Sequence, residues 1–282
     1  MTQAQFNSDA PRATLGTALI TGASSGIGAT YADRLAHRGY DLILVARDQV
    51  RLDELADKLR TKTGTKISVL RADLTNKADL ALVEHQLTSD TSITMLVNNA
   101  GIAANGPLAG ANLNQIEGMI KLNVLALTRL ASIASTEFVA RQQGKLINIA
   151  SVVALAPEMF NASYSATKAY VLSLTQTLHH EISKYGVQVQ AVLPGITRTE
   201  IWERSGIDAA NLPAAMIMEV DELVDAALAG LDDGELITIP SLPDTADWTN
   251  FIAARAKLGP NLSRQHAAPR YQRVAASRSF RT

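Results

Sequence analysis

A chain of 282 residues with 47% hydrophobic and 19% charged residues can bury the core of one large α/β domain, which excludes a generally disordered protein. The absence of cysteine excludes disulfide frameworks, thiolate metal sites and cysteine nucleophiles, and it favours a cytoplasmic protein. Segment 1–14 is polar and lacks the apolar core of a signal peptide, and no apolar run suggests a membrane span, so we expect no membrane association.

The formal net charge of −1 hides an asymmetry along the chain. From Trp248 onward there are seven basic residues and no acidic ones, whereas the rest carries 19 basic and 27 acidic residues, a net charge of −8. A solvated tail explains this pattern, and so does a tail that docks on an acidic surface of its own or a neighbouring subunit. Nucleic-acid binding is disfavoured because no aromatic residues are interleaved with the basic ones in a recognised pattern.

Apolar runs of strand length, rich in Val, Ile and Leu, alternate with longer segments of helical period. The expected strands are residues 17–21, 41–46, 66–71, 94–98, 145–150 and 187–193, with a short seventh at 236–239. The expected helices are residues 27–37, 49–61, 77–88, 113–142 and 163–184, and one that begins near Asp221 as its N-cap. The alternation predicts a doubly wound parallel sheet, a Rossmann fold, in one catalytic domain at 15–240. This domain has a polar N-terminal extension (1–14) and a basic C-terminal extension (241–282).

A glycine-rich turn follows the first expected strand, with the sequence Thr-Gly-Ala-Ser-Ser-Gly-Ile-Gly from Thr21 to Gly28. Glycines at these positions let the backbone turn tightly and approach a pyrophosphate, and the following helix offers free N–H groups to phosphates. A plain strand-to-helix turn would also contain glycine, but the position after the first strand favours a dinucleotide. No Gly-Lys-Ser/Thr follows, so ATP is disfavoured.

The end of the second strand decides the form of the nicotinamide cofactor. An acidic residue there would bind the ribose 2′-OH, but this chain has Ala46 followed by Arg47. A guanidinium favours a 2′-phosphate, so we expect NADP(H), with NAD(H) as the alternative. Asp48 opposes that preference, although it is well placed to cap the next helix.

Ser151 ends the fifth expected strand, and Tyr164 and Lys168 lie four residues apart on one face of the next helix. A free tyrosine has a pKa of roughly 10, and a neighbouring ammonium together with an oxidised nicotinamide would bring it nearer the working pH. Ser151 can donate a hydrogen bond to a substrate oxygen that becomes partly anionic. Such a Tyr–Lys pair is weak on its own, and its position after the fifth strand makes it a candidate proton-transfer site.

With these motifs in this order, the chain resembles the short-chain dehydrogenase/reductase family over residues 15–200. The motifs that carry the resemblance are Thr21-Gly22-x-x-x-Gly26-x-Gly28, Asp73, Asn98-Asn99-Ala100-Gly101, Asn123, Ser151, Tyr164-x-x-x-Lys168 and Pro194-Gly195. The resemblance implies an NAD(P)-dependent oxidoreductase that acts on a small carbonyl or secondary-alcohol substrate, with no metal, and that assembles as a homodimer or homotetramer through helices 113–142 and 163–184.

The resemblance also implies a role for each matching residue. Tyr164 would be the general acid in reduction and the base in oxidation. Lys168 would lower its pKa and hold the nicotinamide ribose, while Ser151 would orient the carbonyl and Asn123 would support a water-linked proton relay. The cofactor would be bound by Gly22, Ser24, Ser25, Gly26, Ile27, Gly28, Arg47, Asp73, Leu74, Asn99, Ala100, Gly101, Pro194, Gly195, Ile196 and Thr199, together with Tyr164 and Lys168.

Substrate contacts are expected from the segments 152–161 and 196–220, which follow the fifth and sixth strands. Their apolar residues favour an apolar ketone, aldehyde or secondary alcohol, unless those side chains pack on the domain or on a partner: Val153, Leu155, Met159, Phe160, Ile201, Trp202, Leu212, Met216 and Met218. Two alternatives stay open, a ketoacyl-thioester reductase and a catalytically silent dinucleotide-sensing protein.

Overall fold

The computed structural model describes residues 15–104, 106–199 and 214–271. The chain forms two compact units, Met1–Ser241 and Leu242–Thr282. The first unit contains every motif discussed above. The assignment of residues 15–240 as the catalytic domain stays a prediction.

The first unit is built on one seven-stranded sheet, in which every pair of neighbouring strands is parallel. The strand order is β3-β2-β1-β4-β5-β6-β7. The strands are β1 (Thr17–Thr21), β2 (Asp41–Ala46), β3 (Ile67–Arg71), β4 (Ile93–Asn98), β5 (Gly144–Ile149), β6 (Val187–Val192) and β7 (Ile237–Thr238). The prediction of a doubly wound parallel sheet is therefore confirmed.

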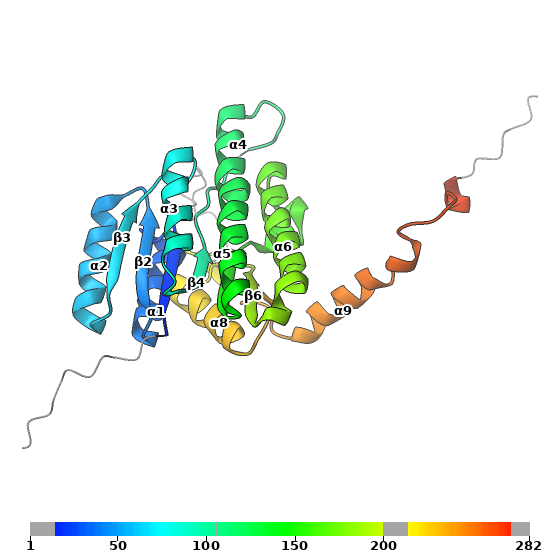
Figure 1. The fold of residues 1–282 in the computed structure, drawn as a ribbon. Coiled ribbons are helices and arrows are strands. Elements are labelled where there is room, and N and C mark those ends of the chain that lie inside the picture. The colour runs from blue at the N-terminus through cyan, green and yellow to red at the C-terminus, as the bar shows by residue number, and fades with distance from the viewer. Residues whose placement is uncertain (1–14, 105, 200–213, 272–282) are drawn as a thin grey trace, which may run out of the picture. The chain divides into compact units, whose positions relative to one another are not determined.

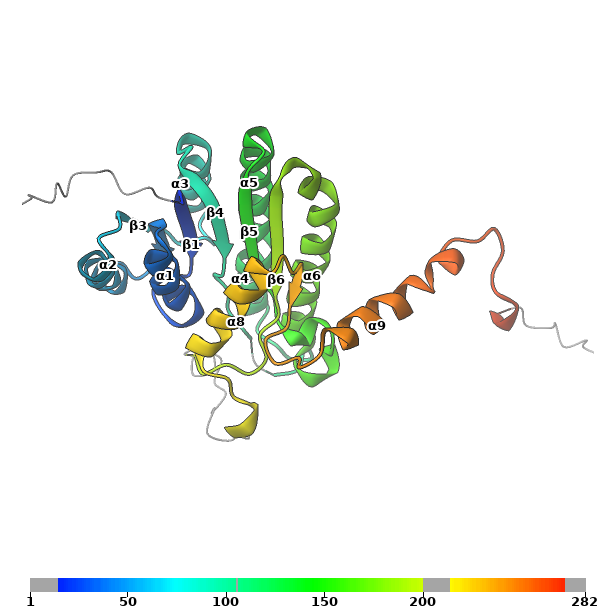
Figure 2. The same cartoon turned by 90° about the horizontal axis from the view of Figure 1, so that it is seen from below.

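Helices cover both faces of this sheet, as Figures 1 and 2 show from two directions. On one face lie α1 (Gly26–Arg38), α2 (Gln49–Thr63) and α8 (Val220–Asp232), whose buried side chains form one hydrophobic cluster with the strands. On the other face α3 (Lys77–Ser89), α5 (Leu127–Arg141) and α6 (Ala162–Ile182) form a second cluster. Because both faces are covered, most residues of the central strands are buried and apolar, which explains the apolar runs in the sequence.

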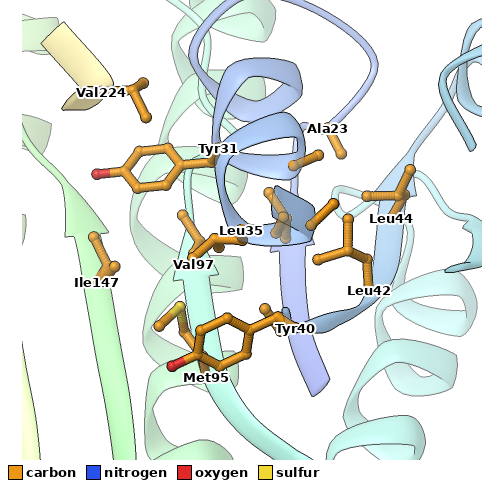
Figure 3. Packing of buried hydrophobic residues seen from close by; sticks show 14 of the residues in the cluster. Ala23, Tyr31, Leu35, Tyr40, Leu42, Leu44, Met95, Val97, Ile147 and Val224 are labelled. Carbon is orange, nitrogen blue, oxygen red and sulfur yellow. The ribbon is translucent and has the colours of Figure 1, made fainter. Parts of the chain in front are cut away.

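The first cluster includes two large aromatic side chains of the α1 region (Figure 3). Tyr31 is fully buried, with its ring between α1, the strands β4 and β5, and Val224 of α8. Burial raises the pKa of Tyr31 far above its usual range. Tyr40 packs against Met95 and Leu42 at the other end of α1. These contacts hold α1 on the sheet and thereby fix the helix end that faces the glycine turn.

The segment expected as one long helix, 113–142, contains a change of helical pitch. It begins as α4 (Leu113–Ile120), continues as a π-helical segment (Lys121–Ala126) and ends as α5. A π-helical segment accommodates an extra residue in a turn and is frequent at functional sites. The inserted turn contains Asn123, which is buried.

The same helical stretch has the composition of a candidate membrane span. Among the described residues, Leu113–Arg141 reaches a mean hydropathy of 1.2 over 18 residues, whereas the sequence suggested no such run. However, 44% of that window is buried inside the protein, and α5 belongs to the second hydrophobic cluster. A helix that covers a sheet passes the same test of length and composition, so this stretch is weak evidence for a membrane span.

The prediction that Asp221 caps α8 is wrong. The helix begins at Val220 with Glu219 as N-cap, and the cap side chain makes no hydrogen bond. Asp221 lies in the first turn, where its carboxylate is 3.2 Å from the guanidinium of Arg34 on α1. Asp48, by contrast, caps α2 as predicted, since its side chain accepts a hydrogen bond from the Arg51 N–H.

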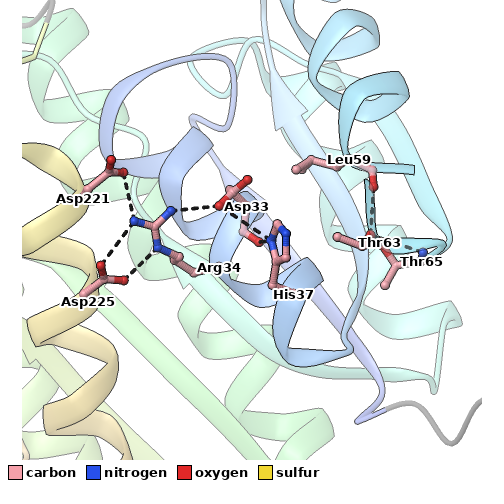
Figure 4. A network of polar contacts seen from close by, with 8 residues as sticks. All are labelled: Asp33, Arg34, His37, Leu59, Thr63, Thr65, Asp221 and Asp225. Atoms are coloured by element: carbon pink, nitrogen blue, oxygen red, sulfur yellow. Dashed lines mark hydrogen bonds and ion pairs between the residues drawn. The ribbon is translucent and has the colours of Figure 1, made fainter. Parts of the chain in front are cut away.

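Arg34 is the centre of an ion-pair network between α1 and α8 (Figure 4). Its guanidinium contacts Asp33, Asp221 and Asp225 at 2.8, 3.2 and 2.8 Å. Hydrogen bonds from Arg34 lower the pKa of Asp225 below its usual range. The network lies at the protein surface, where each pair contributes about 1 kcal/mol or less, so it orients two helices that the buried core already holds together.

Strand order reverses between β1 and β4, because β1 pairs with both β2 and β4. At such a reversal the connections leave in opposite directions, and a crevice opens beyond the carboxyl ends of the strands. The glycine turn after β1 and the Asn98–Gly101 turn after β4 both lie at this point. The fold therefore gathers the sequence motifs at one edge of the sheet.

Candidate active site

The glycine turn after β1 has the backbone geometry that only glycine adopts easily. Gly22 and Gly26 have φ of 67° and 53°, in the left-handed region. Gly28 has no room for a side chain, because a Cβ there would lie 2.3 Å from the Gly22 carbonyl oxygen. The turn thus packs closely against the first turn of α1, and its backbone is left open toward the carboxyl edge of the sheet.

The N-terminus of α1 is suited to an anion. The N-cap Ser25 makes no side-chain cap hydrogen bond, and no acidic residue lies in the first turn. The first N–H groups of a helix have no partner within the helix and carry a partial positive charge. A Cβ on Gly26 would lie 3.3 Å from the Thr199 side chain, so the segment after β6 borders the same turn.

Asn99 joins the glycine turn to the turn after β4. Its side-chain amide donates to the carbonyl oxygens of Thr21 and Gly22, at 2.9 and 3.2 Å. The Thr21 hydroxyl accepts in return from the backbone N–H groups of Asn99 and Ala100, both at 3.0 Å. The side-chain nitrogen of Asn99 therefore holds the two turns together.

The ends of β2 and β3 place two arginines beside Asp73. Ala46 and Arg71 are register partners at the ends of β2 and β3, Arg47 follows Ala46, and both arginines are exposed. Burial alone would raise the pKa of Asp73, but hydrogen bonds from Thr75 and the charges of Arg47 and Arg71 lower it. Arg47 was expected from the sequence, whereas Arg71 was not. The pairing of β2 with β3 brings the end of β3 next to the end of β2, and the charges of both arginines act on Asp73.

Asp73 and Leu74 follow β3 in the predicted position, but their side chains make contacts within the protein. One carboxylate oxygen of Asp73 accepts hydrogen bonds from the N–H and hydroxyl of Thr75, at 2.9 and 2.7 Å. Leu74 is buried in the second hydrophobic cluster. Only the backbone of Leu74 is therefore open to a nucleotide.

The start of α6 is fixed at the residue before its first turn. Asn161 is the N-cap, and its Oδ1 accepts a hydrogen bond from the Tyr164 N–H at 2.9 Å. Its Nδ2 donates to the carbonyl oxygen of Ala104, in the segment after β4. Asn161, which the sequence analysis did not single out, thus ties the backbone of Tyr164 to the neighbouring loop.

The Tyr164 ring is half-buried between an aromatic and a cationic side chain. Phe160 packs edge-on at 5.3 Å between ring centroids, and the Lys168 Nζ lies 5.6 Å from the Tyr164 centroid. Burial raises the pKa of Tyr164 above its usual range. In this state the phenol keeps its proton, so it is available as a donor.

Lys168 is buried, with 6% of its surface exposed, and its Nζ donates to the Ile149 carbonyl oxygen at 2.8 Å. Among the described residues no carboxylate forms an ion pair with it. Burial therefore lowers the pKa of Lys168 to about 8. A buried ammonium with a carbonyl as its protein partner leaves part of its hydrogen-bonding capacity for a ligand.

The π-helical segment brings Asn123 to the same place. Asn123 donates to the Ile102 carbonyl oxygen (2.9 Å) and the Thr167 hydroxyl (3.2 Å), and its Oδ1 accepts from the Ile102 N–H (3.0 Å). A Cβ on Gly101 would lie 3.3 Å from the Asn123 Oδ1 and 3.8 Å from the Lys168 Nζ. Gly101 therefore allows Asn123 and Lys168 to lie close together.

Ser151 lies just beyond β5, in extended backbone, and is buried. Its hydroxyl donates to the Pro194 carbonyl oxygen at 3.3 Å, and the Val152 N–H donates to the same oxygen at 3.0 Å. The segments after β5 and β6 are thus held together. The structure places Ser151, Pro194, Gly195 and Ile196 at the same sheet edge as the glycine turn.

The loops expected to contact the substrate divide into two groups. Val153 is buried, and Met218 packs against the first hydrophobic cluster, so these two side chains stabilise the domain. Met159 and Met216 are exposed. Ile201, Trp202 and Leu212 lie outside the described residues.

The lowered pKa of Lys168 predicts how stability depends on pH. A folded-state pKa of about 8 against 10.5 disfavours the charged form in the folded state, at a cost of about 3 kcal/mol at pH 7. Between pH 8 and 10.5 the unfolded chain binds more protons than the folded one, so this cost disappears as pH rises. Lys168→Met removes the effect, so its free energy of unfolding relative to wild type should fall by up to about 3 kcal/mol from pH 7 to 10.5, measured by urea unfolding.

The exposed Lys58 provides the control, since Lys58→Met should show no such pH trend relative to wild type. A pH-independent difference for Lys168→Met would mean that Lys168 keeps its ordinary pKa.

Comparisons with known proteins agree with this geometry. A family model described as short chain dehydrogenase matches residues 16–209. A short-chain dehydrogenase from Sphingobium yanoikuyae, solved in complex with NADPH, is 54% identical with a TM-score of 0.88, over 91% of this chain and 100% of that chain. The bulky-bulky ketone specific alcohol dehydrogenase from Comamonas testosteroni is 47% identical with a TM-score of 0.85, over 93% of this chain and 100% of that one.

A more distant relative acts on another kind of carbonyl. The very-long-chain 3-oxoacyl-CoA reductase of Phaeosphaeria nodorum is 31% identical over 252 residues, which are 88% of this chain and 72% of that protein. The family match covers the glycine turn, the Asn98–Gly101 turn and the Ser151, Tyr164 and Lys168 positions together. The chain therefore belongs to the short-chain dehydrogenase family, and the expectation of a nicotinamide-dependent oxidoreductase is confirmed.

Proposed function

We propose that this chain is an NADP(H)-dependent enzyme that interconverts a bulky, apolar ketone and its secondary alcohol, with Tyr164 as the acid–base group. The observation that carries the proposal is the arrangement at the start of α6, where a protonated Tyr164 lies beside the buried ammonium of Lys168. When bound, NADPH supplies the hydride. Tyr164 donates a hydrogen bond to the substrate oxygen, and Ser151 does so once its hydroxyl turns away from the Pro194 carbonyl oxygen. Tyr164 then gives up its proton.

The residues at the sheet edge fit a dinucleotide. Gly22 and Gly28 let the turn pack closely on itself and on Asn99, because a Cβ at either position would lie within 3 Å of protein atoms, and α1 presents its N-terminus there without an acidic residue. The rest of the dinucleotide would be lined by Asp73 and the segments Asn99–Gly101 and Pro194–Thr199. Lys168 would hold the nicotinamide ribose and stabilise the phenolate of Tyr164 after proton transfer, because the ammonium lies above the Tyr164 ring.

A 2′-phosphate on the cofactor would meet Arg47 and Arg71. Their proximity to Asp73 supports the preference for NADP(H), since two guanidinium groups at one point attract a doubly charged phosphate. The NADPH complex of the Sphingobium relative supports the same preference. Asp48 does not oppose it, because its carboxylate is engaged as the cap of α2.

The proposed substrate class rests on the Comamonas relative and on the loop after β5. That relative is named for ketones with two bulky substituents. In this chain Phe160 packs against Tyr164, and Leu155 and Met159 lie on the same segment. These residues provide apolar surface beside the proposed reaction centre, which suits a ketone without charged groups. The fungal 3-oxoacyl-CoA reductase keeps a ketoacyl thioester as the second candidate.

A panel of carbonyl compounds tests the substrate class. NADPH oxidation, followed by absorbance, should be faster with ketones that carry two bulky apolar groups than with acetone or with a ketoacyl thioester. The comparison uses kcat/KM for each compound at equal enzyme concentration. A higher kcat/KM for the thioester would favour the second candidate.

Tyr164→Phe tests the acid–base role. Removal of the hydroxyl should lower turnover by about 10²–10⁴-fold, because no other group donates the proton, while NADPH binding stays within about twofold of wild type. NADPH fluorescence measures binding, and the absorbance assay measures turnover. Tyr185→Phe, an exposed tyrosine just after the end of α6, is the control and should keep wild-type turnover.

Turnover of Tyr164→Phe at the wild-type rate would overturn the mechanism. Wild-type protein that binds NADPH but turns over no compound of the panel would favour the dinucleotide-sensing alternative.

Arg47→Ala and Arg71→Ala test the cofactor preference. Loss of either charge-assisted hydrogen bond to a phosphate should weaken NADPH binding by about 10–100-fold and leave NADH binding nearly unchanged. Isothermal titration with both cofactors measures the effect, and Arg51→Ala on α2 is the matched control. Equal losses for NADPH and NADH would contradict an interaction with the 2′-phosphate.

The assembly and location of the protein extend this proposal. Ile120, Leu125 and Tyr170 are exposed, and the Tyr170 and Thr128 hydroxyls lie 2.9 Å apart across α5 and α6. These neighbouring helices therefore offer an apolar face, which supports a homo-oligomer of the proposed enzyme. A cytoplasmic location is part of the same proposal and is supported by the absence of cysteine.

A further inference from the structure

A row of polar side chains crosses the interior between the sheet and α6. Asn98 of β4, Asn148 of β5 and Thr175 of α6 are at most 2% exposed. Their neighbours along the strands are Leu, Ile and Val. Burying amide and hydroxyl groups costs free energy unless they are hydrogen-bonded, so a polar row in an apolar core indicates a requirement other than stability.

The row is connected by hydrogen bonds from strand to strand to helix. The Asn98 Nδ2 donates to the Asn148 Oδ1 at 3.1 Å, and the Asn148 Nδ2 donates to the Thr175 hydroxyl oxygen at 3.0 Å. The Thr175 hydroxyl donates onward to the Val171 carbonyl oxygen at 2.7 Å. The side-chain oxygen and nitrogen of Asn148 thus have one partner each, and the row ends on the backbone of α6.

These contacts lie on the side of α6 that carries the proposed site. Thr175 follows Lys168 by seven residues and Tyr164 by eleven, spacings that keep all three on one helical face. Asn148 precedes Ile149, whose carbonyl oxygen accepts from Lys168, and lies three residues before Ser151. β5 therefore carries both polar contacts to α6 and leads directly to Ser151, and one face of α6 carries Lys168 and Thr175, the partners of these contacts.

Apolar packing alone fixes the position of a helix on a sheet only loosely. Besides the hydrogen bonds of Thr175, Lys168 and Thr167, the buried contacts of α6 come from residues such as Val171, Leu178 and Ile182, whose hydrophobic contacts have no preferred direction. A hydrogen bond between buried groups is directional and is lost when the helix shifts along the strand. Because a misplacement of about 1 Å can cost about 100-fold in rate, the position of α6 matters for the reaction.

We propose that Asn148 and Thr175 are positioning residues: their buried hydrogen bond sets the position of α6 along β5 and thereby the placement of Tyr164 relative to Ser151. The proposal rests on the proposed function, since it concerns the same two side chains. Neither residue touches a substrate or cofactor in this account, and both act through the backbone of the elements that carry Ser151 and Tyr164.

The chain contains a matched buried contact elsewhere. Gln190 of β6 is fully buried, and its Nε2 donates to the Ala227 carbonyl oxygen and the Thr238 hydroxyl, both at 2.8 Å. It joins β6 to α8 and β7, which carry none of the proposed catalytic residues. Gln190→Leu therefore removes a buried polar contact of the same kind and leaves the hydrogen bonds between β5 and α6 unchanged.

Thr175→Val is the main test, because it keeps the shape of the side chain and removes the hydroxyl. We expect kcat to fall by about 10-fold or more, the pH dependence of kcat to shift, and NADPH binding to stay within about twofold of wild type. Thr175→Ser, which keeps the hydroxyl, should restore most of the kcat. Gln190→Leu should be destabilised to a similar extent in urea unfolding yet keep kcat within about twofold of wild type.

Asn148→Leu and the double variant Asn148→Leu/Thr175→Val complete the series, measured well below their unfolding transitions. Wild-type kcat in Thr175→Val, no rescue by Thr175→Ser, or an equal loss of kcat in Gln190→Leu would each overturn the positioning role. Failure of the proposed function is a separate result, because Tyr164→Phe would then retain turnover whatever Thr175→Val does.

Discussion

The buried ammonium of Lys168 is the constraint on which the rest of this site depends. A charged group in the interior is tolerated only when its surroundings are rigid and hydrogen-bonded. Here the Ile149 carbonyl oxygen accepts from Nζ, and burial lowers the pKa of Lys168 to about 8, so the group stays mostly charged at pH 7 but loses its proton more readily than an exposed lysine. The position of this group is set by α6, and the position of α6 is set by its contacts with β5.

Features from several parts of the chain meet around that ammonium: a π-helical turn, a glycine and a helix N-cap. The π-helical turn points Asn123 toward Ile102 and Thr167, and Gly101 leaves room beside both Asn123 and Lys168. Asn161 caps α6 at the Tyr164 N–H. The site is therefore held in place mainly by hydrogen bonds between side chains and backbone. The proposed catalytic groups are positioned by these contacts and can still bind a ligand.

The cofactor side follows a different principle, that of open backbone. Close approach of Gly22 to Gly28, latched by Asn99, creates a turn with no side chain in the way. Arg47 and Arg71 add positive charge where β2 and β3 end. Asp73 experiences both charges and accepts hydrogen bonds from Thr75. A close-packed glycine backbone at one end and exposed arginines at the other suit a ligand that has a pyrophosphate and a charged 2′ substituent.

The sequence by itself determined the fold class and the main motifs, because apolar periodicity and glycine placement reflect local backbone requirements. The strands and most helix boundaries agree with those expectations within a few residues, and Tyr164 with Lys168 could be singled out from helical spacing together with their position after the fifth strand. Tertiary structure decided what depends on pairing between distant segments: Arg71 beside Arg47, Asp221 bound to Arg34, and Asn148 joined to Thr175. Strand register and helix packing determine those contacts, and neither leaves a periodic signal in the sequence. The Tyr–Lys pair was visible in the sequence, whereas the hydrogen bonds between β5 and α6 that hold it in place became visible only in the folded chain.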